Sequence, residues 1–332
     1  MALKLVRAAI VVALVVVLLG GWTRLNDAGL GCPDWPGCYG TWILPSNHAA
    51  LADSHPGVLI DLRKGWIEMI HRYAAGTLGL LVLGLAVVAW RRRTVPDYPR
   101  RLSYVLLGLV IVQALFGMWT VTLQLLPVIV TLHLMGGLAT LSLLVLLQQQ
   151  LKRCGQGLLP VRAHYGTSIL LVFLFLQLLL GGWTSTNYAG WACSDWLYCH
   201  DVEMAQYDFA TGLNPFMAIG PNYEGGLLEA PARAAIQVTH RLGALLLLII
   251  SCWVAWVLWE QRQLRLSLLL YMAALLTQAL LGIANVIWML PLGLAVAHHV
   301  VAVILLLLAL NLHNRAKKPL LEVSHEYRIA CG

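Results

Sequence analysis

The chain has 332 residues, of which 60% are hydrophobic and only 11% are charged, and its net charge is +7 at pH 7. This composition excludes an ordinary soluble domain, in which roughly a quarter of the residues are charged. The basic charge does not indicate a nucleic-acid partner either. The basic residues gather in alternate connections between apolar runs, which is the positive-inside pattern of membrane proteins.

At least seven apolar runs approach or exceed the roughly 20 residues that cross a bilayer, and we expect eight spans. The first follows Lys4 and Arg7 as in a signal peptide, but it lacks a small-x-small cleavage site and continues into a repeated motif, so we expect it to be retained. The predicted spans are residues 5–21, 66–90, 102–125, 128–150, 164–184, 236–259, 266–288 and 292–313. The expected fold class is therefore an all-α integral membrane protein embedded in the lipid bilayer.

The distribution of lysine and arginine predicts the orientation. If the N-terminus is cytoplasmic, 16 of the 22 basic residues lie on the cytoplasmic side. The six left on the outer side are Arg24, Arg63, Lys64, Arg72, Arg233 and Arg241. We therefore expect both termini in the cytoplasm and two long loops on the outer face, at residues 22–65 and 185–235.

An internal repeat divides the chain into two copies. Gly20–Gly40 aligns with Gly181–Asp201 without a gap at a shift of 161 positions, and 11 of 21 residues are identical. The repeat continues beyond the loops, where EMIHR aligns with QVTHR and QALFG aligns with QALLG. The Leu-Pro pair that precedes LH in the first copy aligns with the Leu-Pro pair that precedes AHH in the second. It predicts two pseudo-symmetric four-helix bundles of the same orientation. The expected parts are residues 1–150, a linker at 151–163, residues 164–314 and a cytoplasmic tail at 315–332.

Four of the seven cysteines form one C-x5-C pair in each outer loop, Cys32 with Cys38 and Cys193 with Cys199. An oxidising compartment favours disulfides, and this spacing permits a bridge within each loop, although spacing alone does not prove connectivity. The other cysteines, which lie in a span or on the inner side, are Cys154, Cys252 and Cys331.

Four histidines recur in pairs near the outer ends of the spans. His71 and His240 stand near the start of the second span of each copy, and His133 and His298 lie in the first turns of the fourth. Ionisable residues inside a membrane bundle are costly and usually functional. Two histidines on facing helices can supply both axial ligands of a haem iron. Each copy therefore predicts one haem site.

Two other roles compete with haem ligation for these histidines. Hydrogen bonding between helices suits an isolated histidine better than a duplicated pair. Zinc is a further alternative, but Cys and His lie in different segments without close ligand spacing. His299 competes with His298, and the alignment of the copies favours His298. Four histidines without a repeat partner are expected to be solvated, and these are His48, His55, His200 and His325.

The residues around the first histidine of each pair differ between the copies. Glu68 precedes His71 by three residues, so both share one helix face, whereas the equivalent position in the second copy is Gln237. A carboxylate beside a haem edge can act as a general base or stabilise developing positive charge. Arg72 and Arg241 follow the histidines and could pair with haem propionates. Alternatively, Glu68 only pairs with Arg72.

Taken together, the C-x5-C loop motif, EMIHR, QALFG and their second-copy counterparts resemble the haem A synthase family (CtaA-type) over nearly the whole chain. This resemblance implies oxidation of the C8 methyl of haem O to a formyl group, which gives haem A for terminal oxidases. It implies that His240 and His298 ligate a haem B cofactor. It also implies that His71 and His133 hold the haem O substrate or haem A product, with Glu68 as the catalytic carboxylate.

The resemblance further implies a bacterial plasma (inner) membrane protein that receives substrate from a haem O synthase and delivers product toward terminal oxidase assembly factors. No nicotinamide or flavin motif is present in the sequence, so we expect electrons from an unidentified donor. A homo-oligomer is left open. The alternatives are a bis-histidine haem B electron-transfer protein, an outer-face thiol oxidoreductase and a passive haem carrier.

Overall fold

The computed structural model describes residues 1–44, 60–153, 161–162, 165–195, 199, 203, 206–316 and 318–319. Within these ranges, eight helices are long and apolar enough to cross a membrane, which confirms the predicted spans. They are α1 (Ala2–Leu25), α3 (Leu62–Arg91), α4 (Arg100–Thr122), α5 (Pro127–Arg153), α6 (Tyr165–Thr186), α8 (Ala230–Leu258), α9 (Arg265–Ile287) and α10 (Leu292–Arg315).

Several helices extend further toward the long loops than predicted. Helix α3 begins four residues early because the carboxylate of Asp61 caps it, accepting a hydrogen bond of 3.1 Å from the backbone N–H of Lys64. Helix α8 begins six residues early, with a proline in its first turn. Hydropathy misses these turns because they carry charged residues. The two loops are therefore shorter than predicted, and His71 and His240 lie in the third turn of their helices.

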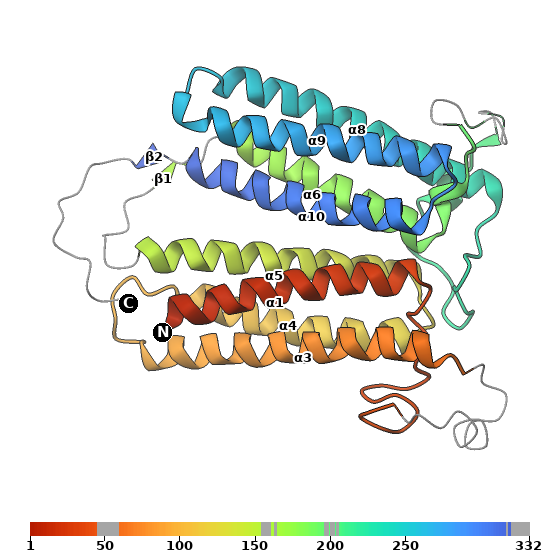
Figure 1. Ribbon diagram of the computed structural model, residues 1–332, viewed down its shortest axis with the longest axis horizontal. Helices are drawn as coiled ribbons and strands as arrows, with labels where there is room; N and C mark the ends of the chain where they lie inside the picture. Colours follow the sequence, from red (N-terminus) through yellow and green to blue (C-terminus); the bar gives the residue numbers. More distant parts are fainter. Residues whose placement is uncertain are drawn as a thin grey trace. The chain divides into compact units, whose positions relative to one another are not determined.

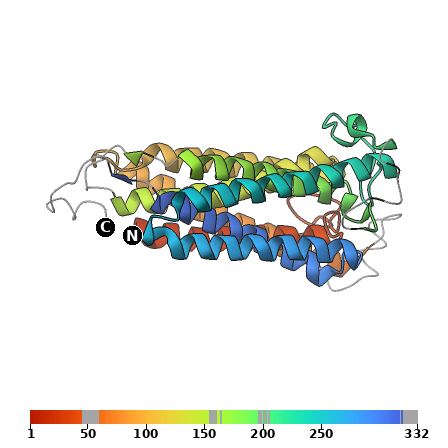
Figure 2. The ribbon, with the colours of Figure 1, turned by 90° about the horizontal axis from the view of Figure 1, so that it is seen from above.

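The first compact unit contains α1, α3, α4 and α5. Helix α1 contacts α3 and α5, and helix α4 contacts the same two helices. The four helices, which run lengthwise beside one another (Figures 1 and 2), thus form a closed ring with α3 opposite α5. The segment Ile219–Glu224 of the second long loop also belongs to this unit. Its Glu224 forms an ion pair of 3.2 Å with Lys64.

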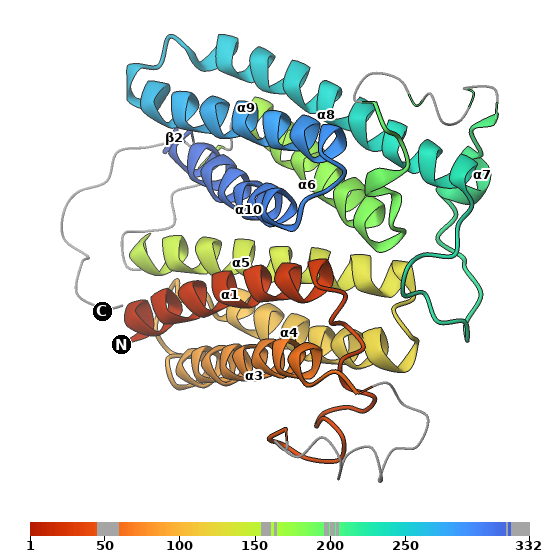
Figure 3. The same ribbon diagram turned by 45° about the vertical axis from the view of Figure 1, so that its right-hand side comes forward.

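The second compact unit contains α6, α8, α9 and α10 (Figure 3). Helix α6 contacts α8 and α10, and α9 contacts the same two, so α8 lies opposite α10. The shorter elements of the unit are η1 (Ala189–Trp191), α7 (Phe209–Gly212) and η3 (Arg262–Leu264). Val161–Arg162 (β1) of the predicted linker pairs antiparallel with Lys318–Pro319 (β2) of the predicted tail.

The helices carry large apolar side chains on their outer surfaces, as expected of a chain surrounded by hydrocarbon. Leu80 on α3 is 72% exposed, and Leu276 on α9 is 62% exposed. The polar and small residues discussed below lie instead between the helices of each ring. The fold therefore places its few ionisable groups away from the surface that contacts lipid.

Candidate functional site

The paired histidines of the first unit lie on the two opposite helices of its ring. His71 on α3 and His133 on α5 have ring centroids 6.4 Å apart, with 84° between the ring planes. The Nδ1 atoms of both rings are buried and bond to no side chain among the described residues. A buried polar atom without a partner is costly unless something else satisfies it. Two facing imidazoles of this kind could hold a ligand between them.

A glycine on the neighbouring helix faces each of these histidines. A Cβ atom built on Gly20 of α1 would lie 3.1 Å from Cε1 of His71, and one built on Gly117 of α4 would lie 3.4 Å from Cε1 of His133. Both distances are shorter than the 3.5–4.0 Å that carbon atoms prefer. The imidazoles can occupy these positions because the facing residues have no side chain.

The second unit repeats this arrangement. The imidazole of His240 on α8 faces Gly181 of α6, and that of His298 on α10 faces Gly282 of α9. A Cβ on either glycine would lie 3.2 Å from Cε1 of its histidine. Among the described residues, a Cβ on Gly282 would contact only atoms of His298. His298, and not His299, is therefore equivalent to the other three histidines.

Two glutamines contact the second-unit histidines. Nε2 of Gln177 lies 3.0 Å from Nδ1 of His240 and also donates to the backbone carbonyl of that histidine at 3.0 Å. Nε2 of Gln278 lies 3.1 Å from Nε2 of His298, whose Nδ1 has no partner among the described residues. Sequence reasoning missed both glutamines. For Gln278, the repeated motif QAL-x-G that also contains the facing glycine was the available signal.

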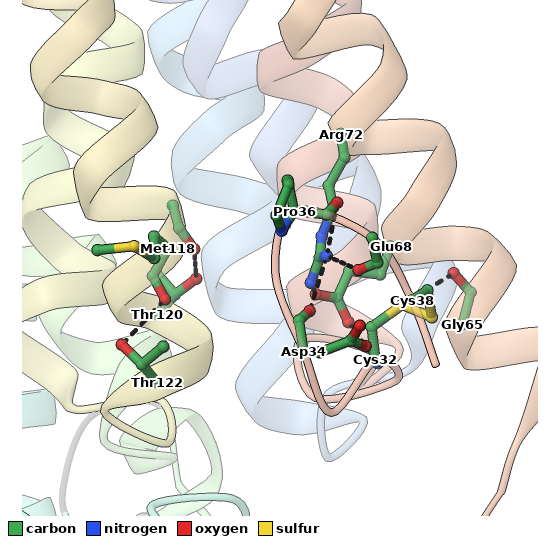
Figure 4. Close-up of polar contacts among 12 residues, drawn as sticks. Cys32, Asp34, Pro36, Cys38, Gly65, Glu68, Arg72, Met118, Thr120 and Thr122 are labelled. Carbon is green, nitrogen blue, oxygen red and sulfur yellow. Dashed lines mark hydrogen bonds and ion pairs between the residues drawn. A yellow bond between two sulfur atoms is a disulfide. The ribbon is translucent and has the colours of Figure 1, made fainter. Parts of the chain in front are cut away.

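Glu68 is buried, with 5% of its surface exposed, and both carboxylate oxygens have partners. Oε1 is paired with the guanidinium of Arg72, and Oε2 accepts a hydrogen bond of 2.9 Å from the backbone N–H of Cys32. Figure 4 shows the Arg72 side chain directed into the first loop beside Glu68. The predicted Glu68–Arg72 pair is therefore present.

The first loop also binds the Arg72 guanidinium through its backbone. Arg72 donates to the carbonyls of Asp34 at 2.9 Å and Pro36 at 3.2 Å, and to that of Gly37. These contacts hold the loop against α3. The carbonyls and the carboxylate already engage this arginine, so its predicted pairing with a propionate would require some of these bonds to be exchanged.

The second unit has an amide and a less fully bonded arginine at the same positions. Gln237 donates to the carbonyl of Gly190 at 2.6 Å and accepts from Arg241 at 3.1 Å. Arg241 also donates to the carbonyl of Asp195 at 2.8 Å. Its other terminal nitrogen, Nη1, is buried without a partner among the described residues. The second unit therefore offers a free cationic donor where the first unit offers a bonded ion pair.

Both loop cysteine pairs are joined as disulfides, Cys32 with Cys38 and Cys193 with Cys199. The first disulfide lies beside α3 (Figure 4), and its loop packs tightly there. A Cβ on Gly31 would lie 2.5 Å from the carbonyl carbon of Lys64, so only glycine fits at this contact. The disulfide loop thus presents the backbone N–H of Cys32 to Glu68. Cys252 is free and exposed.

The zinc alternative finds no support in the part of the chain that the structure describes, where no group of three or more His, Cys, Asp or Glu side chains could hold a metal ion. Axial ligation of a haem requires only two histidines on each site. Several residues assigned from the sequence lie outside the described residues, and these are Cys154, Cys331, His48, His55, His200 and His325.

The fold and the site together define a multi-pass helical membrane protein with paired histidines between its helices. The chain belongs to the COX15-CtaA family, described as cytochrome oxidase assembly proteins, whose family model matches residues 4–310. A protein of Shewanella oneidensis named heme A synthase is 40% identical over 309 residues, covering 91% of this chain and 93% of its own length.

More distant relatives carry the same name. The heme A synthase of Bradyrhizobium sp. (strain ORS 278) is 26% identical and covers 88% of this chain and 85% of its own length. That of Bacillus pumilus is 25% identical and covers 90% of this chain and 89% of its own length. The similarity therefore extends over both units and both loops.

Proposed function

We propose that this protein is a haem A synthase, an oxidoreductase that converts the C8 methyl of haem O into the formyl group of haem A. Membership of the family and the relatives named heme A synthase support this activity. The single observation that carries it in the structure is the broken repeat. Two units share a histidine–glycine arrangement, and only one places a carboxylate, that of Glu68, beside its histidine.

The geometry of the first histidine pair fits axial ligation. Two histidines that both bound one metal ion through bonds of about 2 Å, with roughly 1 Å more from each nitrogen to its ring centre, would have ring centres about 6 Å apart. The centroids of His71 and His133 are 6.4 Å apart. The glycines that leave room for the rings support the same assignment.

We assign His71 and His133 to the substrate haem, and His240 and His298 to a resident haem B. Bound haem B would supply one-electron transfer toward the substrate site. Arg241 supports the second assignment because its free, buried Nη1 suits a propionate. In the first unit Arg72 serves mainly to orient Glu68, and any contact with a propionate would be secondary.

Glu68 is the residue that the chain contributes to the oxidation itself. Arg72 and the Cys32 N–H hold its carboxylate in one orientation. A carboxylate held in this way could accept the proton that leaves the methyl group when that group is oxidised. Gln237 cannot accept a proton in this way, so the second unit is suited to electron transfer.

The proposed membrane arrangement has two pseudo-symmetric bundles, cytoplasmic termini and long loops on the outer face. The repeat supports the symmetry, and the basic residues at the opposite ends of the helices support the orientation. The disulfides in both long loops suit an oxidising outer compartment. In this setting, substrate comes from a haem O synthase, electrons come from a separate donor, and product goes to terminal oxidase assembly. Self-association is compatible with this arrangement.

The test compares the variant Glu68→Gln with Gln237→Glu, the matched variant in the second unit. Each protein is produced in membranes that contain haem O, and extracted haems are separated by chromatography. We expect Glu68→Gln to retain haem B and haem O but to lose most haem A formation, whereas Gln237→Glu keeps forming haem A. Unchanged haem A production by Glu68→Gln would remove this carboxylate from the mechanism.

A further inference from the structure

One side chain in the second unit bonds directly to the ring of a predicted haem ligand. The carboxamide of Gln177 on α6 lies against Nδ1 of His240 on α8, with Nε2 3.0 Å from that nitrogen. The amide is also anchored to the backbone carbonyl of the same histidine at 3.0 Å. Its Oε1 is buried and has no partner among the described residues. The amide therefore bonds through one end only.

The facing helix makes space for this amide. A Cβ atom built on Gly243, three residues after His240, would lie 2.3 Å from Oε1 of Gln177. Such a contact is impossible, so any side chain at position 243 would force the amide away from the imidazole. Gln177 and Gly243 thus act as a pair, because the glycine leaves the space that the glutamine amide occupies.

At His71 the first unit lacks both parts of this pair. The repeat that aligns Gly20 with Gly181 aligns Val16 with Gln177, and the repeat that aligns His71 with His240 aligns Ala74 with Gly243. The side chain of Val16 has neither a hydrogen-bond donor nor an acceptor. No side chain in the described part of the chain bonds to Nδ1 of His71. His71, the histidine beside Glu68, therefore has no amide at the position that Gln177 occupies beside His240.

The chemistry of metal-bound histidine explains why an amide at Nδ1 matters. An imidazole that ligates a metal through Nε2 carries its proton on Nδ1, and a partner that accepts this proton fixes the tautomer and the ring orientation. A carboxamide can donate from its nitrogen or accept with its oxygen. In the geometry described above Nε2 of Gln177 faces Nδ1. Rotation about the last side-chain bond would bring the unpartnered Oε1 to Nδ1 and would give up the hydrogen bond from Nε2 to the His240 carbonyl.

We infer that Gln177 is a positioning residue for His240, which with Gly243 makes the second unit a site of retained haem, while Val16 and Ala74 leave His71 as the exchangeable ligand of the first unit. This inference rests on the proposed function, because it takes His240 and His71 as haem ligands. The contrast concerns His71 alone, because in the first unit a Cβ on Gly136, three residues after His133, would likewise meet the amide of Gln113.

The test measures haem B in the purified full-length protein, with its rate of transfer to apomyoglobin and its midpoint potential as readouts. In Gln177→Leu we expect haem B loss to be about ten- to a hundredfold faster, the usual effect of losing such a partner. The midpoint potential should rise because the ligand becomes less basic. Gly243→Ala should act in the same direction, and Val16→Leu should leave both readouts of haem B unchanged.

Gln177→Glu, which retains an acceptor at Nδ1, separates positioning from simple packing. It should retain haem B better than Gln177→Leu and lower its midpoint potential below that of the parent protein. Conversely, Val16→Gln combined with Ala74→Gly should slow the release of haem from the first unit. The inference would be overturned if Gln177→Leu lost haem B at the parental rate and kept the parental midpoint potential. It would also be overturned if the double variant released haem from its first unit as fast as the parent protein.

A ligand variant distinguishes failure of this inference from failure of the proposed function. His240→Ala should lose haem B altogether. If His240→Ala keeps haem B with an unchanged spectrum, the ligand assignment itself is wrong. If His240→Ala loses haem B while Gln177→Leu behaves as the parent, only the role of Gln177 is refuted.

Discussion

Replacing Gly181 by alanine should weaken haem B binding without weakening the fold. The added Cβ would lie 3.2 Å from Cε1 of His240. Carbon atoms prefer about 3.5–4.0 Å, so the ring must retreat by roughly 0.5 Å. Metal–ligand bonds tolerate only about 0.2 Å. The imidazole therefore cannot keep both a relaxed contact with α6 and a good bond to iron.

The size of the effect follows from the cost of overpacking. Inserting one methyl group into a packed site costs about 1–3 kcal/mol, and each 1.4 kcal/mol is about a factor of ten in affinity. We therefore expect roughly ten- to a hundredfold weaker haem B binding. Helix propensity acts in the opposite direction, since alanine is favoured over glycine in a helix by about 1 kcal/mol. The thermal stability of the haem-free protein should thus not fall.

The assay is haem content per protein after purification, followed by titration of the haem-depleted protein with haem B. Gly108→Ala and Gly76→Ala are matched controls, because a Cβ at either helical position meets nothing within 4 Å. Both should bind haem B as the parent protein does. Full occupancy and an unchanged spectrum in Gly181→Ala would refute the close histidine–glycine contact as a feature of the binding site.

Two further predictions concern the outer ends of the units. Arg241→Gln should reduce haem B affinity, by about 1.5–3 kcal/mol for a lost charged hydrogen bond, because Nη1 has no protein partner within the described ranges; equal affinity in a haem titration would show that this arginine does not contact the cofactor. Cys32→Ser combined with Cys38→Ser should destabilise the first loop by about 2 kcal/mol, the chain-entropy value for so short a loop, and lower haem A formation by loosening the Cys32 N–H from Glu68. Identical thermal unfolding and haem A yield would contradict this coupling.

The spans could be predicted because each is one long apolar run, but their ends could not. The early start of α3 depends on the Asp61 cap, and charged residues in its first turn hide that turn from a hydropathy scale. The histidines could be identified because two copies in one chain give an internal alignment. This alignment also identified Glu68 and Gln237 as the position where the copies differ.

Contacts between helices could not be predicted because they depend on the rotation of one helix against another. Gly20 and Gly181 were visible as repeated residues, yet nothing in the sequence shows that they face His71 and His240. Gln177 stands alone in an apolar run, and only the structure places it against an imidazole. The sequence likewise gives no sign of the loop carbonyls that bind Arg72. The predicted pairing of Arg72 with a propionate therefore did not take these competing partners into account.

The most direct test of the central claim is a site-resolved analysis of extracted haems. The parent protein is compared with His71→Ala, which alters the first unit, and His240→Ala, which alters the second. We predict haem B together with haem O or haem A in the parent, loss of only haem O and haem A in His71→Ala, and loss of haem B in His240→Ala. Haem B alone in the parent, distributed over both units, would contradict the account and identify an electron-transfer cytochrome instead.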